Sequence, residues 1–94
     1  MEGSDLVVEF TVEPFVEGAP GPHVRAALAA AEDVASRTGL RVVFGPFGTS
    51  ITGPDAAVLD ALDAVVRSAL AAGATRVSLQ LARNGAAIGG GEQG

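Results

Sequence analysis

Side chains that commonly do chemistry are scarce in this chain of 94 residues, which has one histidine and no cysteine. All six of its basic residues are arginines, so lysine is absent as well. These absences exclude a thiolate nucleophile, a cysteine metal site and lysine Schiff-base chemistry. His23 has no second histidine with which to complete a metal site, and we expect it to be exposed in the first turn of a helix. The sequence therefore predicts no metal centre and no cofactor.

The carboxylates of the sequence suit the binding of a ligand better than the catalysis of a reaction. Glu9 and Glu13 belong to a segment with the alternation of a strand, which places them on one face and about 13 Å apart along it. That separation is too large for the paired carboxylates of a glycosidase, although either glutamate could balance a positive charge on a ligand. No nucleophile has a neighbouring base in any motif of the sequence. We therefore expect a binding protein and not an enzyme.

The charge balance bears on the partners that the chain can have. Eleven acids against six bases give a net charge of −5, and the sequence has neither tryptophan nor tyrosine. Nucleic-acid binding needs a basic surface, so no nucleic-acid partner is expected, whereas an acidic surface suits a cationic small ligand. The polar start at 1–5 resembles no secretory signal, and no apolar run approaches the ~20 residues of a membrane span. We expect no membrane partner and a cytoplasmic location.

Hydrophobic periodicity predicts six secondary-structure elements. Residues 6–13 alternate between apolar and polar with period two, as a half-buried strand does. Apolar residues recur at helical spacing over 22–38, between a proline suited to the first turn and a glycine suited to the C-terminal cap. The elements that follow are a strand at 40–44, a strand at 49–52, a helix that begins at Asp55 and stops at Gly73, and a strand at 75–82. The apolar stripe of that second helix, which should face the core, includes Leu70.

The order strand, helix, strand, strand, helix, strand predicts an α+β fold. Two βαβ units with right-handed crossovers interleave into one four-stranded antiparallel sheet with both helices on one face, the ferredoxin-like βαββαβ arrangement. We expect residues 1–83 to form this single domain and residues 84–94 to be a flexible glycine-rich tail. A chain of this length builds one modest core, so a ligand site must lie on a sheet face, in a loop or between subunits.

The face of the sheet that no helix covers is where a ligand or a second subunit could bind. Counting alternate positions assigns hydroxyls, acids and a little apolar surface to this open face. Its predicted residues are Val7, Glu9, Thr11, Glu13, Val43, Ser50, Thr52, Ser78 and Gln80. Two interpretations remain open: an ordinary solvated face, or a face for subunit packing whose polar margin is left for a ligand.

Three segments of the chain resemble the thiamine-binding protein family, the YkoF-related small ferredoxin-like proteins. They are the strand around Glu9 and Pro14, the Pro-Phe-Gly-Thr motif at 46–49 within the stretch 45–53, and the final Arg-Val-Ser-Leu-Gln-Leu at 76–81. The resemblance covers residues 6–83, and the motif at 46–49 is its most specific part. It implies binding of thiamine or its hydroxymethylpyrimidine moiety, and assembly through sheet faces and edges into a homodimer or homotetramer.

The resemblance also implies which residues bind the ligand. A quaternary thiazolium suits an acidic margin and an aromatic contact, and an aminopyrimidine needs a carboxylate or amide beside backbone partners. The positions carried over are Glu9, Thr11, Phe47, Thr49 and Ser50. The chain departs from the family pattern at Thr52, where members usually carry a glutamate, and at Gln80 and Ala82, where they carry a basic residue and an aspartate.

A different class of function stays open beside this one. The chain could be an oligomeric interaction or regulatory module, similar in strand order to amino-acid-sensing domains. Its open sheet would then serve only for assembly with a partner protein, or would take a different small metabolite. A nucleic-acid-binding ferredoxin-like domain is disfavoured, because Phe10 and Phe44 fall on the helix-covered face and no basic stripe exists.

Overall fold

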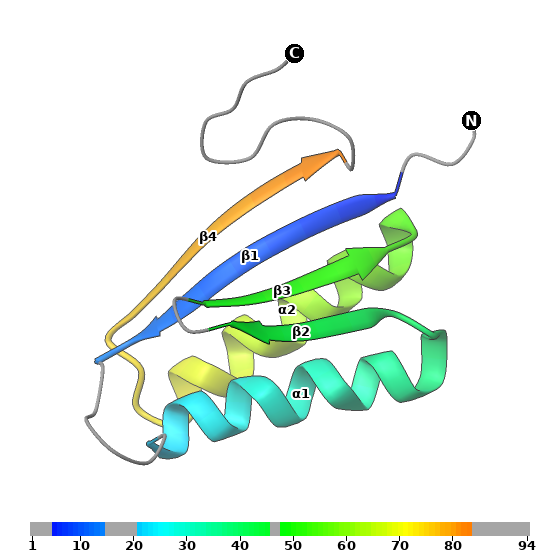
Figure 1. Cartoon of the computed structure of the whole chain (residues 1–94). Coiled ribbons are helices and arrows are strands. Elements are labelled where there is room, and N and C mark those ends of the chain that lie inside the picture. Colours follow the sequence, from blue (N-terminus) through cyan, green and yellow to red (C-terminus); the bar gives the residue numbers. More distant parts are fainter. Residues whose placement is uncertain (1–4, 15–20, 46–47, 84–94) are drawn as a thin grey trace.

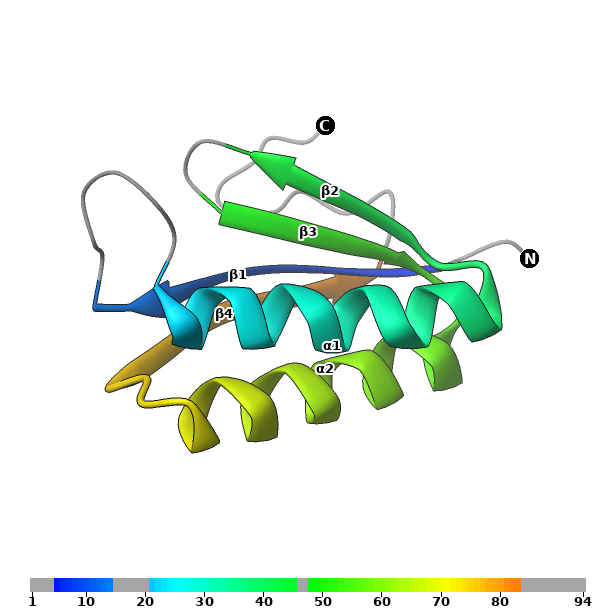
Figure 2. The same ribbon diagram turned by 90° about the horizontal axis from the view of Figure 1, so that it is seen from below.

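The computed structural model describes residues 5–14, 21–45 and 48–83, which form four strands and two helices in the expected order (Figure 1). In chain order they are β1 (Leu6–Glu13), α1 (Pro22–Thr38), β2 (Arg41–Gly45), β3 (Gly48–Gly53), α2 (Asp55–Ala71) and β4 (Arg76–Arg83). The strands form one antiparallel sheet in the order β2-β3-β1-β4, and both helices lie on the same face of it (Figure 2). This is the ferredoxin-like α+β fold that the element order predicts. The tail at 84–94, predicted to be flexible, lies outside the described residues.

Strand β1 runs through the middle of the sheet and supplies both the core and the open face. Val8 and Phe10 are at most 3% exposed under the helices, while Glu9 between them is exposed on the other side. The register places Glu9 opposite Ser50 of β3 and Gln80 of β4. Because directly opposite residues of an antiparallel pair share a face, the register of the sheet confirms the residues predicted for the open face.

Small side chains let the two helices lie close to each other. Ala27 and Ala31 of α1 are fully buried, and so are Ala61 and Ala69 of α2. An alanine at a helix contact keeps the two backbones near the short end of the usual interaxial distances. The largest fully buried side chains are aliphatic and equally compact, namely Ile51, Val8, Val58 and Val65.

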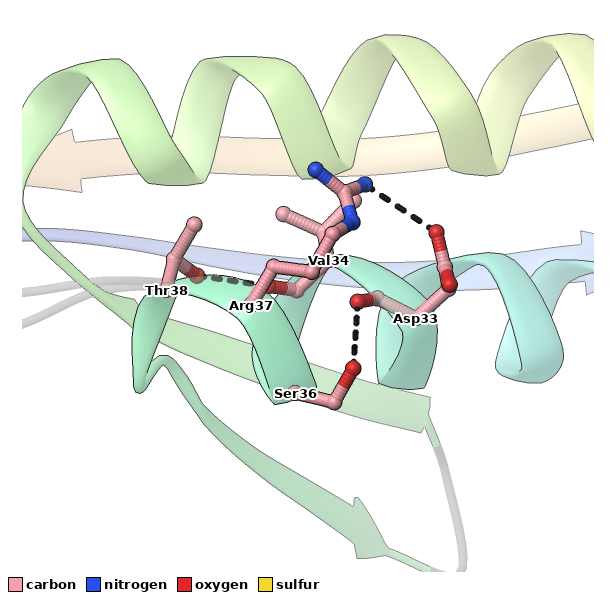
Figure 3. Close-up of polar contacts among 5 residues, drawn as sticks. All are labelled: Asp33, Val34, Ser36, Arg37 and Thr38. Carbon is pink, nitrogen blue, oxygen red and sulfur yellow. Dashed lines mark hydrogen bonds and ion pairs between the residues drawn. The ribbon is translucent and has the colours of Figure 1, made fainter.

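Helix α1 ends in polar contacts at the turn that leads into β2 (Figure 3). The hydroxyl of Thr38 donates to the carbonyl oxygen of Val34 at 2.7 Å, and the Asp33 carboxylate pairs with Arg37 one turn later. Gly39 follows with a φ of 78°, the left-handed conformation that glycine adopts without strain. This is the C-terminal cap predicted for Gly39, and it turns the chain back toward the sheet.

His23 does not have the exposed position that the sequence predicts. Its side chain is buried, with 5% of the residue exposed, and Nε2 donates to the carbonyl oxygen of Pro14 at 2.6 Å. A carbonyl oxygen can only accept, so the contact places a proton on Nε2. The prediction is wrong because helical periodicity does not reveal that the end of β1 meets the first turn of α1.

Gly53 ends β3 at a position where the core leaves no room for a side chain. A Cβ at this position would overlap Cδ2 of Leu40, the buried residue that precedes β2. The glycines with positive φ in the described part of the chain are Gly39 and Gly73, so Gly53 has an ordinary strand backbone. Packing against Leu40, and not backbone conformation, therefore requires glycine here.

Large apolar side chains remain exposed on α2 and on the edge strand β4. Leu70, predicted to lie on the buried stripe of α2, is 53% exposed, and Leu59 on the same helix is 47% exposed. On the edge strand β4, Leu79 and Leu81 are 41% and 42% exposed although they face the helix side of the sheet. We call these four residues the α2–β4 flank. The prediction for Leu70 is wrong because helical spacing does not show how far a helix reaches over the sheet edge.

Candidate functional site

The open face of the sheet is hollowed where its four strands run side by side. The cavity measures about 630 Å³, which is within the usual range of small-molecule sites. We call it the open-face hollow. The open-face side chains that line it are Glu9, Thr11, Val43, Ser50, Ser78 and Gln80.

Glu9 holds the central position in this hollow. It lies in a row across the sheet that runs from Val43 through Ser50 and Glu9 to Gln80. Among the described lining residues Glu9 alone is charged, and within those same parts of the chain its carboxylate makes no ion pair or hydrogen bond. A negative charge flanked by a hydroxyl and an amide is therefore free to meet a ligand.

Two glycines at the β2–β3 turn border the hollow. A Cβ on Gly48 would lie 3.0 Å from the carbonyl oxygen of Phe10 and 3.2 Å from Cγ2 of Thr11. A Cβ on Gly45 would lie 3.1 Å from the carbonyl oxygen of Gly48. These contacts are tight for a methyl group, so Gly48 lets β3 approach β1 closely and leaves the space beside Thr11 open, while Gly45 lets the two strands of the hairpin approach each other.

The structure brings together only some of the residues that the resemblance implies. Glu9, Thr11 and Ser50 share the open-face hollow. Thr49 borders it too, but its side chain points to the helix side, because neighbouring residues of a strand face opposite ways. Phe47 lies outside the described residues.

Three lining side chains are missing from the predicted set of ligand-binding residues. Val43, Ser78 and Gln80 face the same hollow as Glu9. The signal that could have found them is present in the sequence, because strand alternation already assigns all three to the open face. What alternation does not show is which of the open-face positions the twisted sheet gathers around one cavity.

The polar groups of the hollow are a carboxylate, hydroxyls and an amide. Its side chains offer one carboxylate, the hydroxyls of Thr11, Ser50 and Ser78, and the amide of Gln80. Such a set can neutralise a cation and exchange hydrogen bonds with a polar ring. In the ranges that the structure describes, no group of three histidine, aspartate or glutamate residues is placed to hold a metal ion. No helix of these ranges is long and apolar enough to cross a membrane.

These features define a ferredoxin-like α+β protein that carries a hollow of small-ligand size on its uncovered sheet face. Comparison with protein families makes the assignment specific. Residues 8–84 match the family described as thiamine-binding protein, and the chain belongs to this family.

Solved structures share the fold with this chain. A protein from Thermotoga maritima that is named for thiamine biosynthesis or salvage has 24% sequence identity and a TM-score of 0.51, over 84% of this chain and 81% of that one. A hypothetical protein from Methanocaldococcus jannaschii has 24% identity and a TM-score of 0.54, over 85% of this chain and 78% of that one. A domain of unknown function from Bacillus cereus has 22% identity and a TM-score of 0.53, over 86% and 76%. A comparison with curated protein sequences gave no match.

Proposed function

We propose that this chain binds thiamine or its hydroxymethylpyrimidine moiety in the open-face hollow and catalyses no reaction on it. Membership of the thiamine-binding protein family supports the choice of ligand. The observation that carries the proposal is the Glu9 carboxylate, a negative charge without a partner among the described residues at the centre of a hollow of about 630 Å³. No hydroxyl of the described lining is hydrogen-bonded to the Glu9 carboxylate, which favours binding over catalysis.

The two halves of thiamine fit two parts of the lining. The thiazolium carries a permanent positive charge, which Glu9 would balance at short range. The aminopyrimidine has amino hydrogens to donate and ring nitrogens that accept, and Ser50, Ser78 and Gln80 supply matching hydroxyl and amide groups. Thr49 would contribute only its backbone to this hollow, since its side chain lies on the helix side.

Calorimetric titration of the whole chain with thiamine, and separately with hydroxymethylpyrimidine, tests the proposal. Saturation at 100 times the dissociation constant would stabilise the folded chain by about 2.7 kcal/mol, which a thermal melt detects readily. The absence of both heat and thermal shift at millimolar ligand would reject a thiamine-type site.

Two glutamates on one strand provide a matched pair of variants. Glu9→Gln keeps the shape of the side chain and removes its charge, and we expect thiamine binding to weaken about two- to fivefold, as for a solvent-accessible ion pair. Glu13→Gln makes the same change about 13 Å away, beyond the ~8–10 Å screening length at physiological salt, so affinity should change by less than about twofold. Equal losses in the two variants would mean that thiamine senses only the net charge of the chain.

We also propose that the chain associates with itself through the α2–β4 flank. The proposal is supported by the four large apolar side chains exposed there and by β4, an edge strand of eight residues without proline. If two β4 strands paired antiparallel about a two-fold axis at Gln80, Leu79 would lie opposite Leu81 of the partner subunit. Of the two assembly surfaces that the resemblance implies, this observation favours the sheet edge.

A further inference from the structure

Arg41 lies at the margin of the open-face hollow and has no partner among the described residues. It begins β2, an edge strand of the sheet (Figure 1), and faces the open side as Val43 does two residues later. Arg37, Arg67 and Arg83 each pair with an aspartate at 3.0 Å or less. Within the ranges that the structure describes, the exposed side chain of Arg41 makes neither an ion pair nor a hydrogen bond. Its positive charge is therefore free to meet a ligand.

Hydroxyl groups, and not carboxylates, adjoin Arg41 on the open face. The register places Thr52 of β3 directly opposite Arg41, and Ser50 is the next residue of β3 on the same face. Arg76 of β4 also makes no ion pair with a described residue, but the register places Glu13 opposite it. Arg41, Thr52 and Ser50 therefore form a group of hydrogen-bond donors with no acid across the strand pair. We call these three residues the Arg41 group.

The donors of the Arg41 group match an anion that has several oxygen atoms. A guanidinium presents its N–H groups in a planar fork, which binds two oxygens of one carboxylate or phosphate. A phosphate monoester has three terminal oxygens and a charge of about −1.5 to −2 at pH 7, so it can accept from the fork and from a hydroxyl at once. A carboxylate has two oxygens and a single charge. A phosphate monoester is therefore the better match.

One small molecule can contact Arg41 and Glu9 together, because both residues face the open side. Val7 lies in the same cross-strand row as Arg41, and Glu9 follows Val7 by two residues on β1. Two strand spacings of ~4.8 Å and the rise of two residues put the Cα atoms of Arg41 and Glu9 about 12 Å apart. The two side chains carry opposite charges, so the ligand that fits both of them has a cation and an anion.

We propose that the open-face hollow takes a phosphate monoester of a cationic ring, with the cation at Glu9 and the phosphate at the Arg41 group. This preference rests on the proposed function, because the cation of the same molecule occupies the hollow. In thiamine the thiazolium ring carries a hydroxyethyl chain, whose phosphate ester places both charges in one molecule. Arg41 would then determine the specificity between thiamine and thiamine monophosphate.

Calorimetric titration of the whole chain with thiamine and with thiamine monophosphate, in a buffer without phosphate, tests the preference. We expect the monophosphate to bind about two- to fivefold more tightly, as for a solvent-accessible ion pair. Arg41→Gln should abolish this preference and leave the affinity for thiamine within twofold. Thr52→Glu should abolish it too, because a carboxylate directly opposite Arg41 would pair with the guanidinium.

Arg76→Gln is the matched control, since it makes the same change of charge at the far end of the sheet. The rows of Arg41 and Arg76 cross β1 at Val7 and Glu13, about 20 Å apart along the strand, which exceeds the ~8–10 Å screening length at physiological salt. The preference for the monophosphate should therefore persist in this variant. Equal losses in Arg41→Gln and Arg76→Gln would mean that the monophosphate senses only the net charge, and would overturn the proposal.

The outcomes separate this proposal from the function on which it rests. Equal affinities for the two ligands in the unaltered chain, or a preference that persists in Arg41→Gln, overturn the phosphate site and leave thiamine binding intact. If neither ligand binds, the proposed function is rejected, and inorganic phosphate alone then decides on the Arg41 group. Phosphate should perturb the amide chemical shifts of Arg41, Thr52 and Ser50 in the unaltered chain and not in Arg41→Gln; the absence of these shifts rejects the anion site as well.

Discussion

Replacing Gly53 by alanine should destabilise the chain through a single contact. The new Cβ would overlap Cδ2 of Leu40, while the Leu40 Cγ and Cα, at 3.6 Å and 3.8 Å, stay at ordinary contact distance. Only the end of the Leu40 side chain must therefore move. Because Leu40 is 7% exposed, this movement takes place within the core, where overpacking costs about 1–3 kcal/mol.

The net effect is smaller than the cost of the overlap. Alanine reduces the conformational freedom of the unfolded chain and recovers about 0.4–1 kcal/mol, since the backbone of Gly53 is not in the left-handed region. We expect a net loss of about 1–2 kcal/mol in the free energy of unfolding. For a domain of this size that corresponds to a melting temperature lower by about 4–16 °C.

A double-mutant cycle in urea isolates the contact. Leu40→Ala alone should cost about 2–5 kcal/mol, but in that background Gly53→Ala should stabilise the chain by about 0.4–1 kcal/mol, because the atom it strikes is gone and only the effect on the unfolded chain remains. Gly73→Ala is the control: its φ of 107° makes any side chain strained with nothing nearby to hit, so its cost should be the same with or without Leu40. If the effects of Gly53→Ala and Leu40→Ala simply add, the packing explanation of Gly53 is refuted.

Two further predictions concern the start of α1 and the flank. His23→Leu should lower the free energy of unfolding by about 1–3 kcal/mol, because the Pro14 carbonyl loses its donor. His23→Gln keeps a donor and should recover part of the loss. Equal melting temperatures of the two variants would show that only the volume of the side chain matters. Leu81→Lys should shift the molar mass measured by light scattering from that of an oligomer to that of a monomer. Arg67→Ala is the control: it removes an exposed i,i+4 ion pair of α2 and should leave the mass unchanged. If the unaltered chain is already a monomer at micromolar concentration, self-association through this flank is refuted.

Much of the fold could be predicted from the sequence because local patterns and tertiary packing agree in it. The alternation at 6–13 and the helical spacing at 22–38 match β1 and α1 residue for residue, and each remaining strand differs from its prediction by one residue at each end. Strand alternation also assigned Glu9, Thr11 and Ser50 to the open face, and the structure shows that all three line one hollow there. These are properties of single elements, which short-range sequence patterns describe well.

What could not be predicted depends on how elements lie relative to one another. The burial of His23 requires the end of β1 to reach the first turn of α1, and the exposure of Leu70 depends on how α2 sits beside the edge strand. The helix-side position of Thr49 was implied by alternation, but its burial depends on how α1 and the hairpin pack against each other. The spacing of apolar residues along the chain does not encode how two elements are oriented relative to each other.

The alternation of β1 has a consequence for how this protein can change over evolutionary time. Its even-numbered positions hold the core and its odd-numbered positions face the open side, where Glu9 and Thr11 line the open-face hollow, so substitutions at these two positions change that lining at little cost to folding. Insertion or deletion of one residue is a different matter, since it would turn Val8 and Phe10 outward and Glu9 into the core at once. We therefore expect divergence of binding preference in this strand to proceed by point substitution at alternate sites, with its length held fixed.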